Sequence, residues 1–147
     1  MPETFPLYSL HFQSDLENIS PEQLQGFFEG WPDAPSAHTL HRMLTASYRV
    51  SLAVDTQSGE VAGFIQAISD GILTAFIPLL KVRMEFRGQG TGRALVLHLL
   101  AQLEHLYAVD LSCDDALTTF YERLGFMPGR AMIRRRYSRQ SGESRRS

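Results

Sequence analysis

Three consecutive stretches in the middle of the chain carry the alternating or continuous apolar pattern that is typical of β-strands. Apolar and polar residues alternate over 48–55, and a second strand is expected over 60–69. The turn signal Asp70-Gly71 leads into a third, nearly all-apolar strand over 72–83. Pro78 lies within this third strand, where a proline indicates a bulge or an edge without a neighbouring strand.

Four other stretches carry helix signals. Ser20, Pro21 and Gln23 have the pattern of a capping box with proline in the first turn, and Ser36 is placed as the N-cap of a second helix. In the third stretch, leucines recur every fourth residue and would share one face. The expected helices cover about 20–30, 36–46, 90–107 and 114–124, and Gly125 stops the last one.

Shorter strands complete the expected fold. One is predicted over 6–12, one over 108–113, and one or two closing strands over 126–137. The order β-α-α-β-β-β-α-β-α-β(-β) predicts a mixed α/β sandwich, antiparallel in the middle and parallel across the long-helix crossover. We expect a single domain over residues 1–137 and a basic, disordered tail over 138–147.

The distribution of charge adds a candidate binding site to this fold. The 147 residues carry 14 basic and 16 acidic side chains, a net charge of −2, and Lys81 is the only lysine. Lys81, Arg83, Arg87 and Arg93 crowd together with Glu85 alone opposing them, whereas the rest of the body is acidic. This separation argues against a broad nucleic-acid-binding face and predicts a local anion site.

The sequence also argues against a disulfide-rich or zinc-binding protein and against a membrane or secreted protein. Cys113 is the only cysteine, so the chain has neither a disulfide framework nor a cysteine-based zinc site. No stretch approaches the ~18 uninterrupted apolar residues of a membrane-spanning helix, and the first residues lack the pattern of a signal peptide. We therefore expect no membrane partner and a location in the reducing cytoplasm.

The basic cluster coincides with a glycine-rich turn between a strand and a helix. Glycines at 88, 90 and 92 allow backbone amides to approach a ligand, and the following helix adds its unpaired N–H groups. Arg87 and Arg93 flank the turn, so the segment predicts a cradle for a diphosphate. A P-loop would need a lysine after the glycines, and a Rossmann turn would need its third glycine one residue later.

Two motifs in this half of the chain resemble the GNAT superfamily of N-acetyltransferases. Arg87, Gly90 and Gly92 match its Arg-x-x-Gly-x-Gly pyrophosphate motif, and Phe120 to Phe126 resembles its FYxxLGF signature. The resemblance covers about residues 48–137. It implies a GNAT-like sheet that is splayed between the fourth and fifth expected strands, which cover 72–83 and 108–113. It also implies that an acetyl group is transferred from acetyl-CoA to a primary amine by direct attack in a ternary complex, without a metal.

The resemblance also implies individual roles. The Val82 amide would stabilise the oxyanion, and Tyr121 would protonate the departing CoA thiolate. Trp31 and Asp70 are candidates for the acceptor pocket. Asp114 stands where the family often has Asn. The residues implied to contact the cofactor are Leu80, Lys81, Val82, Arg87, Gly88, Gln89, Gly90, Thr91, Gly92, Arg93 and Asp114.

Several alternatives stay open at this point. A non-catalytic acyl-CoA-binding or regulatory module could use the same scaffold, and a Rossmann-type nucleotide enzyme ranks third. No ionisable residue lies in 74–80, so the sequence names no general base; the hypothesis is deprotonation through a water relay, with Asp70 or Asp115 as the candidates. Cys113 as an acyl-enzyme nucleophile is disfavoured. The acceptor can be a small molecule or a peptide, the acidic body favours a cationic one, and a homodimer is left open.

Overall fold

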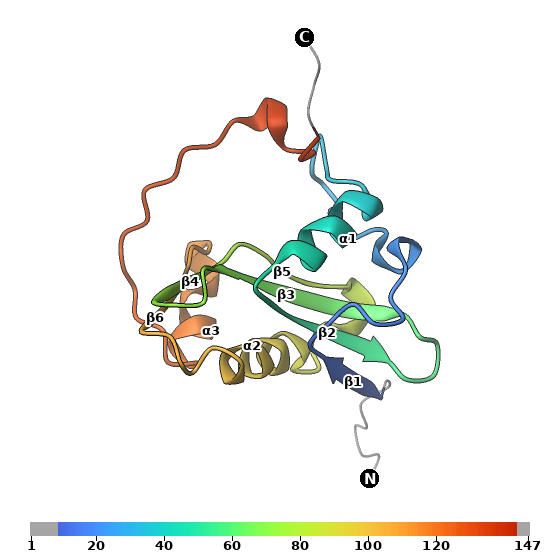
Figure 1. Cartoon of the computed structure of the whole chain (residues 1–147), viewed down its shortest axis with the longest axis horizontal. Helices are drawn as coiled ribbons and strands as arrows, with labels where there is room; N and C mark the ends of the chain where they lie inside the picture. The colour runs from blue at the N-terminus through green and yellow to red at the C-terminus, as the bar shows by residue number, and fades with distance from the viewer. Residues whose placement is uncertain (1–8, 144–147) are drawn as a thin grey trace.

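The computed structural model describes residues 9–143, and within them the strands form one mixed sheet (Figure 1). Its order is β1-β2-β3-β4-β6, with β5 paired to β3. Neighbouring strands are antiparallel except β4 and β6, which are parallel. The strands are β1 (Leu10–Gln13), β2 (Arg49–Asp55), β3 (Val61–Ser69), β4 (Thr74–Ile77), β5 (Leu80–Val82) and β6 (Ala108–Leu111). The predicted fold class is confirmed.

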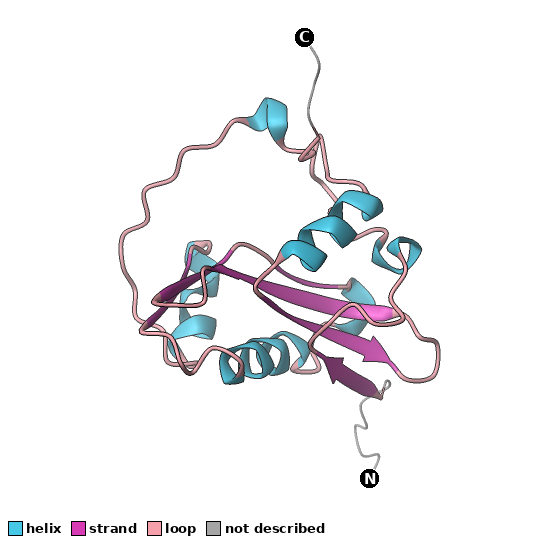
Figure 2. Cartoon of the chain, viewed as in Figure 1, coloured by secondary structure: helices cyan, strands magenta, loops and turns pink. Residues whose placement is uncertain are grey.

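Helices cover both faces of this sheet (Figure 2). Helix α1 (Ala37–Ala46) begins at the predicted N-cap, where the Ser36 hydroxyl accepts a hydrogen bond from the Thr39 amide. It covers one face, and α2 (Thr91–Ala101) and α3 (Thr118–Glu122) cover the other. The 3-10 turns are η1 (Pro21–Leu24), η2 (Met84–Phe86), η3 (Asp115–Leu117) and η4 (Tyr137–Arg139).

Two apolar clusters hold the layers together. Leu40 and Leu44 of α1 pack on Phe64, and Leu95 and Leu99 of α2 pack on the opposite face. Strand β3 runs between the two clusters, and its first seven residues are all buried. A strand that is covered on both faces reads as a continuous apolar run, which explains the weak alternation of its sequence.

Two predicted elements differ from the structure. The expected helix over 20–30 is only the turn η1, although Gln23 Oε1 does accept from the Ser20 amide at 2.7 Å, as in a capping box. The chain leaves helical geometry at Gln25, which is extended with φ of −72° and ψ of 149°, and Gly26 follows with φ of +82°. The closing strands over 126–137 do not form either, because no strand of the described chain lies beside that segment.

The ends of the chain are only partly described. Residues 6–8 of the predicted first strand and 144–147 of the predicted tail lie outside the described residues. Within the tail, η4 is followed by Gln140, whose Oε1 accepts a hydrogen bond from the Asp33 amide at 3.0 Å. Disorder of the tail stays a prediction. Over the described range, no helix is both long and apolar enough to cross a membrane.

Arg83 ties three segments together at the end of β5. Its Nε donates to the Val61 carbonyl at 2.7 Å and its Nη2 donates to the Gln23 carbonyl at 3.0 Å. The guanidinium carbon also lies 4.2 Å from the centre of the Phe27 ring. The side chain therefore joins η1 and the start of β3 to the strand that leads into the glycine-rich turn.

Replacing Arg83 with methionine should lower the free energy of unfolding by about 2–4 kcal/mol, because two carbonyls lose a charged donor. Urea unfolding measures this change. Arg42→Met, at an exposed position of α1, is the matched control and should change the same quantity by less than about 0.5 kcal/mol. Equal effects of the two substitutions would contradict the assigned role of Arg83.

Candidate active site

A bulge at Pro78 divides the third predicted strand into β4 and β5. Ile65 lies opposite Leu80, whereas Ile68 lies opposite Phe76, so one extra residue is accommodated on the side of Pro78. Proline has no N–H to give to a neighbouring strand, and an extra residue bends the strand that carries it. Both halves of the predicted strand therefore pair with β3 in different registers, and only β4 also pairs with β6.

Strand β5 has an open edge because of this bulge. Pairing between β4 and β6 ends at Ile77 and Leu111, and β5 pairs only with β3 among the described strands. The Arg83 amide bonds to Ala62 and the Leu79 carbonyl accepts from Gln66, both on β3. Since these groups alternate along an antiparallel strand, the backbone groups of Leu80 and Val82 face the opening.

The glycine-rich turn lies directly after β5 and begins α2. Gly88 and Gly90 have φ of +77° and +79°, and a methyl group built on either would meet no atom within 4 Å. The turn thus presents bare backbone toward open space. The Thr91 hydroxyl donates to the Phe86 carbonyl at 3.1 Å and holds the first turn of α2 in place. The unpaired N–H groups at this helix start are suited to an anion.

The basic residues that are close in sequence lie in different places around β5. Arg87 Nε donates to the Val82 carbonyl at 3.0 Å, so this guanidinium lies at the open edge, beside the turn. Arg83 is engaged with Val61 and Gln23 and does not contribute to the cradle. Gln89 donates to the Glu85 carbonyl at 3.4 Å, and Arg93 is exposed in the first turn of α2.

The second motif places two aromatic side chains near this opening. A methyl group on Gly92 would lie 3.7 Å from Phe120 Cζ and 3.9 Å from Val82 Cγ2, so α3, α2 and β5 meet there. Tyr121 is buried, with its ring 4.9 Å from that of Phe120. Burial raises the pKa of the Tyr121 phenol, and the nearby Cys113 thiol raises it further. The phenol is therefore protonated at neutral pH and able to donate.

On the face of β5 that points away from α2, the Lys81 side chain lies against two aromatic rings. Its Nζ is 4.9 Å from the centre of the Trp31 ring and 5.6 Å from that of Phe28. Burial lowers the pKa of Lys81, and the positive charge of Arg87 lowers it further. Sequence reasoning assigned Lys81 to the cofactor and missed this contact with Trp31, because the two residues are fifty positions apart.

Asp70 and Asp114, the remaining predicted site residues, lie far from each other in sequence and follow different strands. Asp70 lies in the hairpin after β3, about 20 Å along that strand from Phe64, which is opposite Lys81. Its Oδ1 accepts from the Ile72 amide at 2.9 Å, so it is not beside Trp31. Asp114 is exposed and follows β6 where β6 diverges from β5, next to the exposed Cys113.

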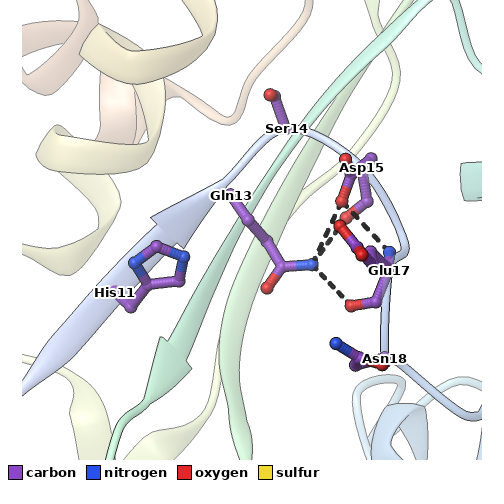
Figure 3. Close-up of a pocket in the computed structure, with 6 residues that line it drawn as sticks. All are labelled: His11, Gln13, Ser14, Asp15, Glu17 and Asn18. Carbon is purple, nitrogen blue, oxygen red and sulfur yellow. Dashed lines mark hydrogen bonds between the residues drawn. The ribbon is translucent and has the colours of Figure 1, made fainter.

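A surface hollow at the end of β1 lacks the basic residues and glycines expected of a site for a diphosphate. A hollow of about 300 Å³ after β1 is lined by His11, Gln13, Ser14, Asp15, Glu17 and Asn18 (Figure 3). There the Gln13 amide donates to the carbonyls of Asp15 and Glu17, so the polar groups bind one another. Over the described residues, no group of three or more His, Cys, Asp or Glu side chains is arranged to hold a metal ion.

Comparisons with known proteins agree with this geometry. A family model described as an acetyltransferase (GNAT) domain matches residues 15–137. An uncharacterized N-acetyltransferase, ycf52, of Porphyra purpurea is 26% identical over 79% of this chain and 70% of its own length. Its counterpart in Gracilaria tenuistipitata var. liui is 34% identical, but the match spans only 44% of this chain and 37% of that protein.

A solved structure from Deinococcus radiodurans R1, assigned to the acetyltransferases, shares both sequence and fold. It is 46% identical, covers 98% of this chain and 99% of its own, and superposes with a TM-score of 0.90. The match of the family model over most of the chain and the agreement of the fold lead to one conclusion. The chain belongs to the GNAT family of acetyltransferases.

Proposed function

We propose that the chain transfers an acetyl group from acetyl-CoA to a primary amine by direct attack in a ternary complex. The observation that carries this proposal is the open edge of β5 beside the glycine-rich turn. The edge offers the backbone groups of Leu80 and the Val82 N–H to the amide-containing pantetheine arm, while the Val82 carbonyl is held by Arg87. The turn offers amides and charge to the diphosphate. GNAT proteins use acetyl-CoA, which supports the assignment.

Backbone groups and side chains would both bind acetyl-CoA, each at a different part of the molecule. Leu80 and Val82 face the opening and would pair with the arm in place of a strand. The segment Arg87 to Arg93 would hold the diphosphate, with Gly88 and Gly90 leaving room for close approach. Arg87 would join the two parts, because its Nε already holds the Val82 carbonyl while its other nitrogens can reach an anion.

The chemistry then needs three groups. The lone pair of the neutral amine forms a C–N bond to the thioester carbonyl, and the Val82 N–H stabilises the resulting oxyanion. The C–S bond breaks, the thiolate leaves, and Tyr121 supplies its proton. The nitrogen loses its extra proton to a base, which completes the amide and free CoA.

Lys81 is our candidate for that base. It is the ionisable side chain of β5, and it lies against Trp31, the predicted acceptor-pocket residue. In its neutral form the amine can accept a proton, and the lowered pKa favours this form relative to an ordinary lysine. Asp70 loses support, because it is at the far end of β3. Once it has taken up the proton, Lys81 would repel a strongly cationic acceptor, the kind that the acidic body had favoured.

The alternative function is an acyl-CoA-binding or regulatory module without turnover, for which the same opening would suffice. The absence of a metal requirement, the small-molecule or peptide acceptor and the homodimer stay predictions. The reducing cytoplasm stays the proposed location, because the single Cys113 is an exposed free thiol.

A panel of primary amines tested with acetyl-CoA should give release of free CoA thiol with at least one amine. Acetylated product, identified by mass spectrometry, checks the nitrogen as the acceptor atom. Tight acetyl-CoA binding without turnover of any amine would favour the binding module, and tight binding of NAD without CoA would favour the nucleotide enzyme.

Tyr121→Phe should lower kcat by about 10²-fold or more, because the thiolate would leave without a proton donor. Tyr107→Phe, at an exposed tyrosine, is the control and should leave kcat unchanged. Because the folded pKa lies above 10, the wild type should show no loss of this acid between pH 7 and 9. An unchanged kcat in Tyr121→Phe at neutral pH would remove the role.

The pH dependence of kcat/KM tests Lys81, with an acceptor amine of low pKa so that the acceptor itself does not titrate. Activity should rise as Lys81 loses its proton, with a midpoint below the ordinary 10.5. Lys81→Arg keeps the positive charge but cannot act as a base, so it should lose this limb and most of the activity. A wild-type profile in Lys81→Arg would refute the assignment.

A further inference from the structure

Lys81 carries the only side-chain amine of the whole chain. The sequence has 14 basic residues, and every one of them except Lys81 is an arginine. A guanidinium stays protonated in proteins, whereas the neutral amine of a lysine is a nucleophile. The chain therefore offers a bound thioester a single side-chain amine, and that amine belongs to β5, the strand with the open edge.

The position of Lys81 in β5 brings its amine close to the proposed thioester. Lys81 lies between Leu80 and Val82, whose backbone groups face the opening. A ligand that takes the place of a neighbouring strand would lie about 4.8 Å from β5. The lysine side chain is a flexible four-carbon stem, which can carry its amine across such a spacing. A thioester carbonyl held at the Val82 N–H would thus be within reach of the Lys81 amine.

Two aromatic rings hold the charged form of Lys81 on the face of β5 that points away from α2. Its Nζ lies 4.9 Å from the centre of the Trp31 ring and 5.6 Å from that of Phe28. This attraction depends on the positive charge, because the face of an aromatic ring attracts a cation. A neutral amine loses that attraction and can turn toward the opening. Loss of one proton therefore both releases the amine and makes it nucleophilic.

The surroundings of Lys81 favour this loss. Burial lowers the pKa of the amine, and the positive charge of Arg87 lowers it further. Within the described part of the chain, no carboxylate forms an ion pair with Lys81 that would stabilise its charge. The site thus combines a reachable amine with an environment that disfavours its protonated form.

We propose that the chain acetylates its own Lys81 when acetyl-CoA is bound and no acceptor amine is present. This inference rests on the proposed function, because it uses the same acetyl-CoA in the same opening. The lone pair of Nζ forms a C–N bond to the thioester carbonyl carbon, and the C–S bond breaks. The thiolate takes a proton from Tyr121, which regains one from water. Nζ releases one proton to water, which leaves acetyl-lysine and free CoA.

Acetylation would remove the proposed base from the site. An amide nitrogen is neither basic nor charged, so acetylated Lys81 can neither accept the proton of an acceptor amine nor bind Trp31 as a cation. A chain that binds acetyl-CoA without an acceptor would inactivate itself. A bound acceptor amine would protect Lys81, because it competes for the same acetyl group.

Incubation of the protein with acetyl-CoA alone, followed by mass spectrometry of its peptides, tests the proposal. Lys81 should gain one acetyl group, with a first-order rate constant that does not depend on the protein concentration. Excess CoA should lower this rate, because it competes for the opening. Arg42→Lys is the matched control, since it adds a lysine at an exposed position of α1. In that variant the added lysine should react at least about tenfold more slowly than Lys81.

Calorimetry of acetyl-CoA binding on the same sample separates this proposal from the proposed function. Binding of acetyl-CoA, or turnover of an amine, without any acetyl group on Lys81 would overturn self-acetylation alone, whereas absence of binding would overturn both. Equal rates at the two lysines of Arg42→Lys would also overturn it, because the reaction would then be ordinary chemical acetylation.

Activity after the modification tests the consequence for the enzyme. With any amine that the panel identifies as an acceptor, kcat/KM should fall in proportion to the fraction of chains that carry acetylated Lys81. Partial modification by a limited incubation supplies the intermediate points. An unchanged kcat/KM in fully acetylated protein would overturn self-inactivation.

Discussion

Parallel strands stay paired only while each offers a donor and an acceptor at every second residue, and Pro78 interrupts that condition at one position. The strand before it pairs with β6, and the strand after it pairs only with β3. One extra residue therefore leaves one edge of β5 without a neighbouring described strand. The open edge of β5, beside which the glycine-rich turn lies, depends on this divergence.

The segments around the opening are held by buried contacts rather than by the opening itself. Arg83 fixes the far side of β5, Thr91 fixes the start of α2, and Phe120 lies where α2, α3 and β5 meet. The backbone that faces the proposed ligand is thus positioned before any ligand binds. Such preorganisation reduces the entropy that binding would otherwise cost.

The sequence predicted those features that depend on neighbouring residues. Ser36 as a cap, the hairpin at Asp70-Gly71 and the bulge at Pro78 are local, and the structure contains each. It predicted too long a helix after Ser20, because a capping pattern indicates where a helix begins but not that the backbone becomes extended at Gln25.

Contacts between distant segments could not be predicted in this way. The Lys81–Trp31 contact, the separation of Arg83 from Arg87 and the detachment of residues 127–136 all depend on tertiary structure. The predicted closing strands over 126–137 have no partner among the strands that the structure describes. A strand propensity alone does not supply a neighbouring edge.

Lys81 and Val82 are adjacent in β5 but contact different surroundings, one through its side chain and the other through its backbone at the open edge. The side chain at one position contacts the aromatic residues of the loop before α1, and the backbone of the next faces the opening. On the proposed function, the residues that surround Lys81, and with them the molecule that is modified, could change without altering the groups proposed to hold the donor. A fold divided in this way can diversify in substrate while it conserves its reaction.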